Sequence, residues 1–208
     1  KPNLQFIATQ RAKFTQSISL NPRVWSSKKG VKKLLSHFYN QSFLSVENEQ
    51  ERMGNSFNFN PFDFDESKLI GLNFNLRNSI YFNKNLQKYS VTYTFGKNRN
   101  KQQYFIGSQE NNIKLHQADF AHKFASFWLF ELMGKTSENN LETENFNNRN
   151  YTIRANEIQP KISLLYNKNN RFTAFYHFKD KENQLPSFEQ LNQQKFGFEY
   201  FYISSKKN

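Results

Sequence analysis

Apolar and polar side chains alternate one by one along several long stretches of this chain. In residues 69–83 the even positions are apolar except for one Asn, and the odd positions include Gly, Asn, Arg and Ser. Successive side chains of a β-strand point to opposite faces, so this alternation predicts a strand with one apolar face. The stretch is much longer than the roughly 5–6 residues of a usual soluble strand. Its apolar face carries Ile70, Leu72, Phe74, Leu76, Ile80 and Phe82.

The next stretch repeats the pattern and predicts a hairpin. Ser90, Thr92 and Thr94 separate the apolar side chains, and residues 83–85 (Asn-Lys-Asn) form a turn, since Asn tolerates a positive φ. We then expect a polar turn over residues 96–101 and a further strand over 102–109. The apolar positions of the second hairpin strand are Tyr89, Val91, Tyr93 and Phe95.

The same period recurs at both ends of the chain. Residues 160–167 and 172–178 read as a second hairpin around a turn at 168–170, and residues 196–202 read as a strand after a longer loop. Near the N-terminus, Phe14, Ile18 and Leu20 alternate with polar residues. These segments extend the predicted sheet over most of the chain.

Four stretches are less regular. Helical spacing of apolar residues predicts one short amphipathic helix near residues 30–39. Residues 120–133 suit a buried helix or a hairpin turning near His122 and Lys123, and the neighbouring strands favour the hairpin. Residues 135–149 are rich in Asn, Glu and Thr and predict an exposed loop, and Pro61 predicts a loop within residues 57–68.

Together these elements predict an all-β fold of eight to eleven antiparallel strands in an up-and-down meander. It would be either a set of outer-membrane-type β-barrel strands or a large open sheet. No linker or composition shift divides the chain, so we expect one β-rich domain over residues 1–208. Because Lys1 is not a start Met and no signal peptide precedes it, we expect a processed product or a fragment of a longer chain.

Composition removes several classes of protein. The absence of Cys excludes a disulfide scaffold and any thiolate metal site, and no apolar run is long enough for a transmembrane helix. The 29 Asn and 15 Gln residues would suggest a low-complexity chain, but many lie opposite an apolar strand residue or in a predicted turn. The 24 Phe, 10 Tyr and 2 Trp residues largely form one face of the meander.

The formal charge of +12 could indicate binding to nucleic acid. Lys and aromatic residues interleave, as in readers of single strands, but no RNA-binding motif accompanies them. Most basic residues fall in predicted turns, where they would keep a sticky sheet soluble or lie beside anionic lipid headgroups. We therefore expect no nucleic-acid partner and no small-molecule substrate.

Candidate chemistry is sparse. His116 and His122 would share a strand face but lie too far apart to bind one metal ion. Asp63, Asp65 and Glu66 resemble a cation-binding loop but lack the EF-hand pattern. No phosphate-binding loop, nucleophile elbow or zinc-protease motif occurs. We expect no catalytic residue, no cofactor and no metal site.

A one-sided meander can bury its apolar face in three ways. A soluble sandwich or barrel puts that face inside, an outer-membrane barrel puts it against lipid, and an open sheet lays it against another protein. Strand length and aromatic residues near strand ends favour the membrane. The expected lipid- or partner-facing stripe comprises Ile70, Leu72, Phe74, Leu76, Ile80, Phe82, Tyr89, Val91, Tyr93 and Phe95.

Residues 53–207 resemble the C-terminal β-strand region of large, mostly uncharacterised outer-membrane or cell-surface proteins of Bacteroidota. Three pieces carry the resemblance: Phe59-Asn60-Pro61-Phe62 before a long strand, residues 148–153 before residues 158–163, and residues 171–176 before residues 179–183. The resemblance implies a non-enzymatic structural role in a Gram-negative cell envelope, with outer-membrane lipid or other envelope proteins as partners. The alternative is a soluble β-sandwich or barrel that binds a polyanion, either glycan or nucleic acid.

Overall fold

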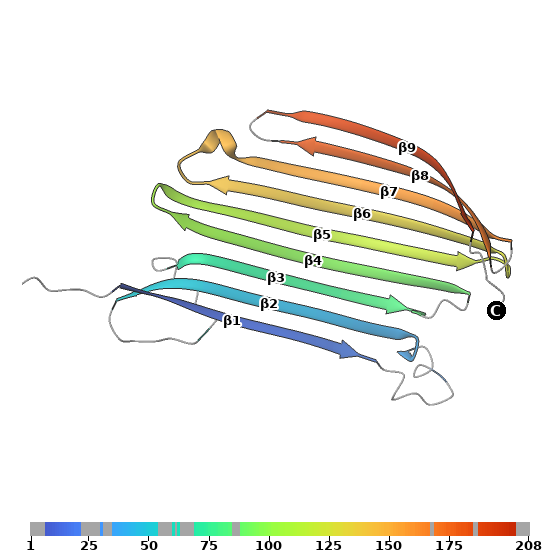
Figure 1. Cartoon of the computed structure of the whole chain (residues 1–208), viewed down its shortest axis with the longest axis horizontal. Helices are drawn as coiled ribbons and strands as arrows, with labels where there is room; N and C mark the ends of the chain where they lie inside the picture. The colour runs from blue at the N-terminus through green and yellow to red at the C-terminus, as the bar shows by residue number, and fades with distance from the viewer. Residues whose placement is uncertain are drawn as a thin grey trace, which may run out of the picture.

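The chain forms one antiparallel sheet of nine strands in sequence order (Figure 1). This computed structural model describes residues 7–21, 30, 35–53, 60, 62, 69–84, 88–166, 169–184 and 187–202. Each strand pairs with its neighbours in the sequence, and β1 and β9 form the two free edges. The predicted all-β, up-and-down meander is therefore confirmed, and the sheet is open.

The strands are 14 to 17 residues long. At roughly 3.4 Å per residue they extend about 45–55 Å. One 3-10 turn, η2 (Asn147–Arg149), lies between β6 and β7. The strands are β1 (Ile7–Leu20), β2 (Phe38–Met53), β3 (Leu69–Phe82), β4 (Tyr89–Tyr104), β5 (Gly107–Lys123), β6 (Trp128–Thr143), β7 (Tyr151–Leu165), β8 (Asn170–Asn183) and β9 (Glu189–Tyr202).

The hairpins expected from strict alternation are present. Phe82 lies opposite Val91 and Ile80 opposite Tyr93 in the β3–β4 pair. Asn83 adopts the left-handed conformation, with φ of 53°, as a turn Asn can. The ambiguous stretch 120–133 is a hairpin rather than a helix, with its turn at residues 124–127, just after the predicted position.

Two sequence predictions were wrong in the same way, because polar residues continue strands instead of ending them. Residues 96–101, expected as a turn, lie inside β4, and the turn falls at Phe105 and Ile106, within the predicted strand 102–109. Residues 135–143, expected as exposed loop, belong to β6. Lys97, Arg99 and Lys101 are thus strand residues rather than turn charges. Their cross-strand partners on β5 supply the reason, since charged and amide side chains pair there.

The short helix expected near residues 30–39 falls largely on residues 31–34, which lie outside the described part of the chain. Leu35 is helical, but the expected end was wrong, because Phe38 and Tyr39 already belong to β2. Most of the expected loop at 57–68, including Asp63, Asp65 and Glu66, also lies outside the described residues. Within it, Phe62 is described, and its ring lies 5.3 Å from that of Phe14.

A small apolar core lies on β2 and β3, next to that contact. Val46, Leu69 and Leu72 are buried, and Leu44 and Phe74 pack against them. Asn48, also buried, donates a hydrogen bond to the backbone carbonyl of Asn60. This cluster lies on β2 and β3 and, among the described residues, does not extend across the nine-stranded sheet. The exposure of side chains on the two faces of β3–β9 is therefore a separate feature of the sheet.

Candidate functional site

Parts of β3–β8 have an inverted distribution of burial. Side chains at paired positions share a face, so the register assigns each strand residue to one of two faces. On one face, large apolar side chains are exposed: Ile158 by 53%, Phe172 by 47% and Ile162 by 43%. On the other face, a set of polar side chains is buried, comprising Ser79, Thr94, Thr143, Glu157, Ser163 and Thr173. Both faces of the edge strand β9 are exposed. Exposed large apolar groups and buried polar groups are the informative departures from ordinary folding.

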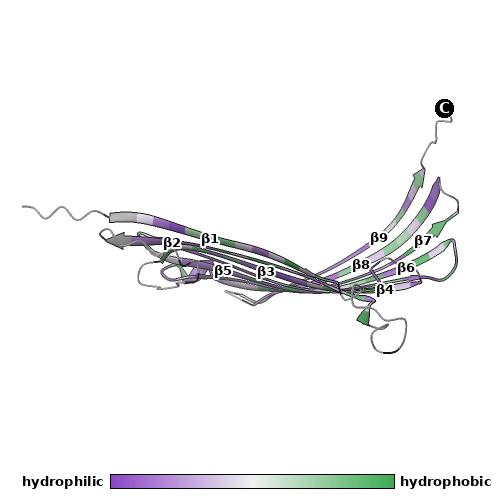
Figure 2. Ribbon diagram, turned by 90° about the horizontal axis from the view of Figure 1, so that it is seen from below, coloured by the Kyte–Doolittle hydropathy of each residue, from purple (hydrophilic) through white to green (hydrophobic). Residues whose placement is uncertain are grey.

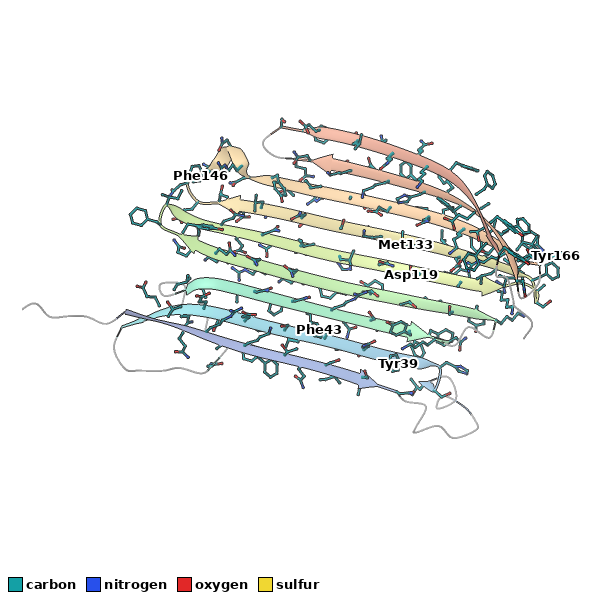
Figure 3. The ribbon with its side chains drawn as sticks, in the orientation of Figure 1. Tyr39, Phe43, Asp119, Met133, Phe146 and Tyr166 are labelled. Atoms are coloured by element: carbon teal, nitrogen blue, oxygen red, sulfur yellow. The ribbon has the colours of Figure 1, made fainter. Side chains whose placement is uncertain are left out.

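We call the exposed and half-buried apolar side chains of the first face the apolar band. It lies toward the end of the sheet where β3 meets β4, β5 meets β6 and β7 meets β8 (Figure 1). Figure 3 shows aromatic side chains gathered at that end of β6–β9, near Tyr166, and Figure 2 shows apolar ribbon there, where the strands curve away from the rest. The band comprises Ile80, Phe82, Tyr89, Val91, Tyr93, Phe95, Phe120, Trp128, Phe130, Leu132, Ile158, Ile162, Leu164, Phe172, Tyr176, Phe178, Phe196, Phe198, Tyr200 and Tyr202.

The apolar band crosses the strands obliquely. A row is a set of residues that are paired from one strand to the next. The row that starts at Phe95, the last band residue of β4, ends at Asn192 in β9. The band in β9 begins at Phe196, four positions beyond that row. The row through Phe82 reaches Phe196 in β9, and the band there ends at Tyr202, six positions further on. Between its first strands and β9 the band is therefore displaced by four to six positions. The displacement is not a regular step, because the band begins in the same row at Phe120, Leu132 and Phe196 and two positions nearer the polar end at Ile158 and Phe178. With strands about 4.8 Å apart and about 3.4 Å per residue, the displacement between the first and last strands averages to a tilt of about 30–35°.

Aromatic contacts hold the band together across strands. The rings of Phe172 and Tyr200 are stacked with centroids 4.7 Å apart, and Tyr176 and Phe196 lie 5.9 Å apart. The Tyr200 hydroxyl donates to the Asn170 side-chain oxygen at 2.5 Å. Tyr rings thus present apolar surface outward while their hydroxyls find partners near the strand ends, the behaviour of aromatic residues at a membrane interface.

The opposite face, which we call the polar face, is lined by hydroxyl, amide and charged side chains. Ser79 and Thr94 share a hydrogen bond at 3.0 Å, and Ser163 and Thr173 share one at 3.1 Å. All four side chains are buried. The small hydroxyl side chains are buried between larger neighbours on the same face, where they bond to each other across strands.

Two carboxylates on the polar face are each held by cations. Glu157, only 8% exposed, has Lys179 Nζ at 3.0 Å, Lys135 Nζ at 3.3 Å and His177 Nε2 at 3.5 Å from its carboxylate oxygens. Glu131 has Lys161 Nζ at 2.7 Å. Because each acid is matched by cations from neighbouring strands, these groups form cross-strand ion pairs that hold β6, β7 and β8 together.

A charged zone adjoins the apolar band on the same face. Within β4 the side chains on this face change from Phe95 to Lys97 and Arg99. Arg99 donates two hydrogen bonds of 2.8 Å to Glu110. Further along, Glu138 lies between Lys114 at 3.4 Å and Arg154 at 3.0 Å. The change from aromatic to ionic side chains is complete within one strand position, so the face has a sharp boundary.

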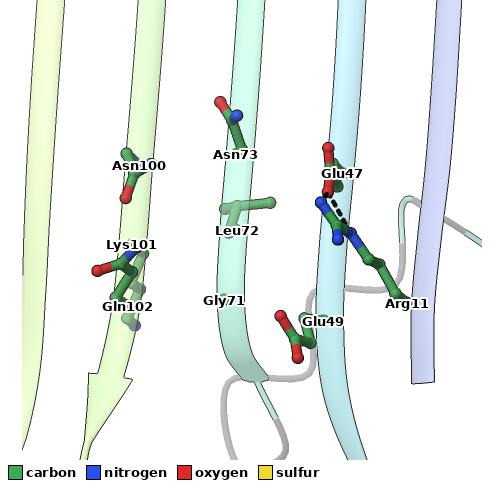
Figure 4. A pocket seen from close by; sticks show the side chains of 9 residues that line it. All are labelled: Arg11, Glu47, Glu49, Gly71, Leu72, Asn73, Asn100, Lys101 and Gln102. Atoms are coloured by element: carbon green, nitrogen blue, oxygen red, sulfur yellow. Dashed lines mark hydrogen bonds and ion pairs between the residues drawn. The ribbon is translucent and has the colours of Figure 1, made fainter. Parts of the chain in front are cut away.

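A shallow depression crosses β1–β4 near the other end of the sheet (Figure 4). Glu47 accepts a hydrogen bond from Arg11, and Lys13 Nζ lies 3.6 Å from its carboxylate. The hydrogen bond from Arg11 holds the pKa of Glu47 below its usual value. The carboxylate is therefore ionised and paired, an arrangement that suits cross-strand cohesion better than proton transfer.

The predicted stripe divides into two parts. Ile80, Phe82, Tyr89, Val91, Tyr93 and Phe95 lie side by side in the apolar band. Leu72 and Phe74 belong instead to the small core on β2 and β3, with Leu76 next to them on the same face. Ile70 adjoins the register shift opposite Glu49 and Gln50.

Sequence reasoning missed how far the band extends. The expected stripe covered two strands, but paired rows carry it through β5, β6, β7, β8 and β9. The alternation in 160–178 and 196–202 contained the signal. What the sequence lacked was the register, which aligns these separate faces into one surface.

His116 and His122 lie on the face that carries the band. His116 Nδ1 is 2.7 Å from the Tyr93 hydroxyl, and the His122 ring packs 4.3 Å from Phe124. Within the described residues, no cluster of three or more metal-binding side chains occurs. The described part of the chain also contains no helix with the length and hydropathy needed to cross a membrane.

No protein-family model matches this chain, and neither the curated proteins nor the solved structures include a match to it.

Proposed function

We propose that this chain is a non-enzymatic wall segment of an outer-membrane β-barrel in a Gram-negative cell envelope. The apolar band contacts lipid, and the polar face lines the barrel interior. The charged zone projects beyond the hydrocarbon layer. The observation that carries this proposal is the inverted burial within β3–β8, with Phe172 and Ile158 exposed and Ser163, Thr173 and Glu157 buried.

The slope of the band supports the proposal independently. Strands of a closed barrel tilt by about 35–45° from its axis, so a horizontal lipid layer must cross the paired rows obliquely. The band slope corresponds to about 30–35° from the strand spacing and rise. Strands of 14–17 residues also exceed the roughly 9–11 that a membrane strand requires.

The envelope setting adds chemical support. Lys97 and Lys114 face each other on the charged side of the apolar band, and Glu138 lies 3.4 Å from Lys114. Lipid headgroups carry phosphate, which could pair with Lys97 at this border. A border of mixed charge beside a lipid-facing band suits such a surface.

Extraction from membranes tests this function. Because a chain of charge +12 can adhere to anionic lipid from outside, the membranes are first washed with high salt and alkaline carbonate. A barrel wall segment stays in the membrane pellet through both washes and leaves it only with detergent. Release by either wash, or recovery as a soluble monomer without detergent, would reject the proposal and favour the soluble β-sandwich.

A further inference from the structure

The two edges of the sheet are open. Among the residues that the structure describes, β1 pairs with β2 alone and β9 with β8 alone. Every strand residue of β9 except Gly197 is exposed. An unpaired strand edge within hydrocarbon leaves backbone groups without hydrogen-bond partners, at several kcal/mol for each group. If the apolar band lies in lipid, both edges must therefore be covered.

The sheet cannot cover its edges by closing on itself with antiparallel pairs. Successive strands are antiparallel, so β1 and β9, the first and last of nine, run in the same direction. Joining β9 directly to β1 would create the one parallel pair in a meander of antiparallel pairs. Membrane barrels of this kind avoid it by having an even number of strands.

A second copy of the chain does not solve the problem. Rotation about the barrel axis would place β9 beside β1 of the second copy, which again run in the same direction. A two-fold axis across the strands would pair β9 with its own copy in antiparallel fashion. If the two β9 strands pair over their full length, the apolar part of each strand, Phe196 to Tyr202, lies beside the polar part of the other, Glu189 to Lys195. The apolar bands of the two copies are then out of line.

We infer that an odd number of further β-strands lies between β9 and β1, antiparallel to both, with outward apolar side chains that continue the apolar band. The inference rests on the proposed function. The strands belong to the same polypeptide outside residues 1–208, because each neighbouring pair in this sheet is also consecutive in sequence. Continuing the meander keeps that order and needs no crossover.

Amide hydrogen exchange on the detergent-solubilised protein, isolated from its native envelope, tests this closure. In an antiparallel strand, alternate amides point to opposite neighbours. A free β9 edge makes every second amide exchange faster, by on the order of a hundredfold. A covered edge makes all of them slow. Residues 189–195 are the informative stretch because they lie outside the apolar band, where water reaches the backbone. The interior strand β8 is the control and is slow throughout.

The closure predicts uniformly slow exchange along 189–195, with no separate chain co-purifying. An alternating fast and slow pattern would overturn it, even if lipid contact of the band were established. If the amides of residues 189–195 are uniformly protected only while a second, separable polypeptide is bound, the inference that the covering strands belong to the same chain is overturned. Uniform protection in a protein whose band proves to be exposed to water would support the closure and reject the proposed function instead.

Discussion

At the scale of single residues, the sheet places ionic side chains where water reaches them and pairs them across strands. In the charged zone, Arg99 and Glu110 form a two-point contact, and Glu138 is bridged by two cations. Hydrogen bonds from Arg99 hold the pKa of Glu110 below its ordinary value, and those from Arg154 do the same for Glu138. These ion pairs lie outside the apolar band, in contact with water. Their contribution to stability therefore depends on the pH of the surrounding solution.

The lowered pKa values predict acid sensitivity of the charged zone. A carboxyl group with a depressed folded-state pKa stabilises the fold above its unfolded pKa, and that contribution is lost as pH falls through the folded value. The free energy of unfolding in bilayers should therefore stay level toward pH 5 and decrease below the ordinary carboxyl range. Glu110→Gln should remove part of this decrease and cost about 1 kcal/mol at pH 7.

Denaturant titrations of the wild type and Glu110→Gln across pH measure this effect. Glu189→Gln, which changes an exposed acid at the start of β9 opposite Asn183, serves as the control and should leave the pH profile close to that of the wild type. Equal pH profiles for the wild type and Glu110→Gln would show that the Arg99 contact contributes nothing.

At the scale of elements, the outermost hairpin depends on one close approach. Gly197 of β9 lies directly opposite Phe175 of β8, and a side chain at Gly197 would collide with the Phe175 ring. The ring covers the glycine on the polar face, with Lys195 Nζ 5.8 Å from its centroid. A ring over a strand glycine restores the packing that the missing side chain would otherwise provide.

This contact predicts that Gly197→Val destabilises the β8–β9 pair by roughly 1–3 kcal/mol, because the Phe175 ring must move away. Gly134→Ala in β6 is the control, since an added Cβ there meets no atom within 4 Å. Comparing the unfolding free energies of both variants checks the prediction. Similar values for the two would mean that the ring adapts without cost.

Sequence reasoning succeeded for elements whose alternation is apolar against polar. It found β3, the first half of β4, β8 and the end of β9 because their apolar faces stand out. It failed for residues 96–101 and 135–143, where both faces are polar and strand and loop look alike. Cross-strand ion pairs such as Arg99 with Glu110 favour the strand conformation in those segments. The sequence of one strand does not show which residue lies opposite it, so these pairs could not be predicted. The sequence predicted the apolar surface as a stripe on β3 and β4. It did not predict that the same surface continues over the five strands from β5 to β9.

At the scale of the whole molecule, the proposal assigns the apolar band to lipid and the polar face to the barrel interior. A charge in the middle of that band must be expensive. Ile162→Lys, on the apolar face of β7, should cost about 2–4 kcal/mol in bilayers. Asn192→Lys, at an exposed polar position of β9, should change stability little. Unfolding titrations in lipid vesicles measure both. A neutral Ile162→Lys would place that face in water.

The most direct measurement of the central proposal is quenching of a fluorophore by spin-labelled lipid. The chain has no Cys, so Phe198→Cys and Asn192→Cys each provide one labelling site, both on the same face of β9. In bilayers, nitroxides on the acyl chains should quench the label at position 198 strongly and the label at position 192 weakly. Equal weak quenching at both positions, with both labels reached by a water-soluble quencher, would contradict the membrane-facing band.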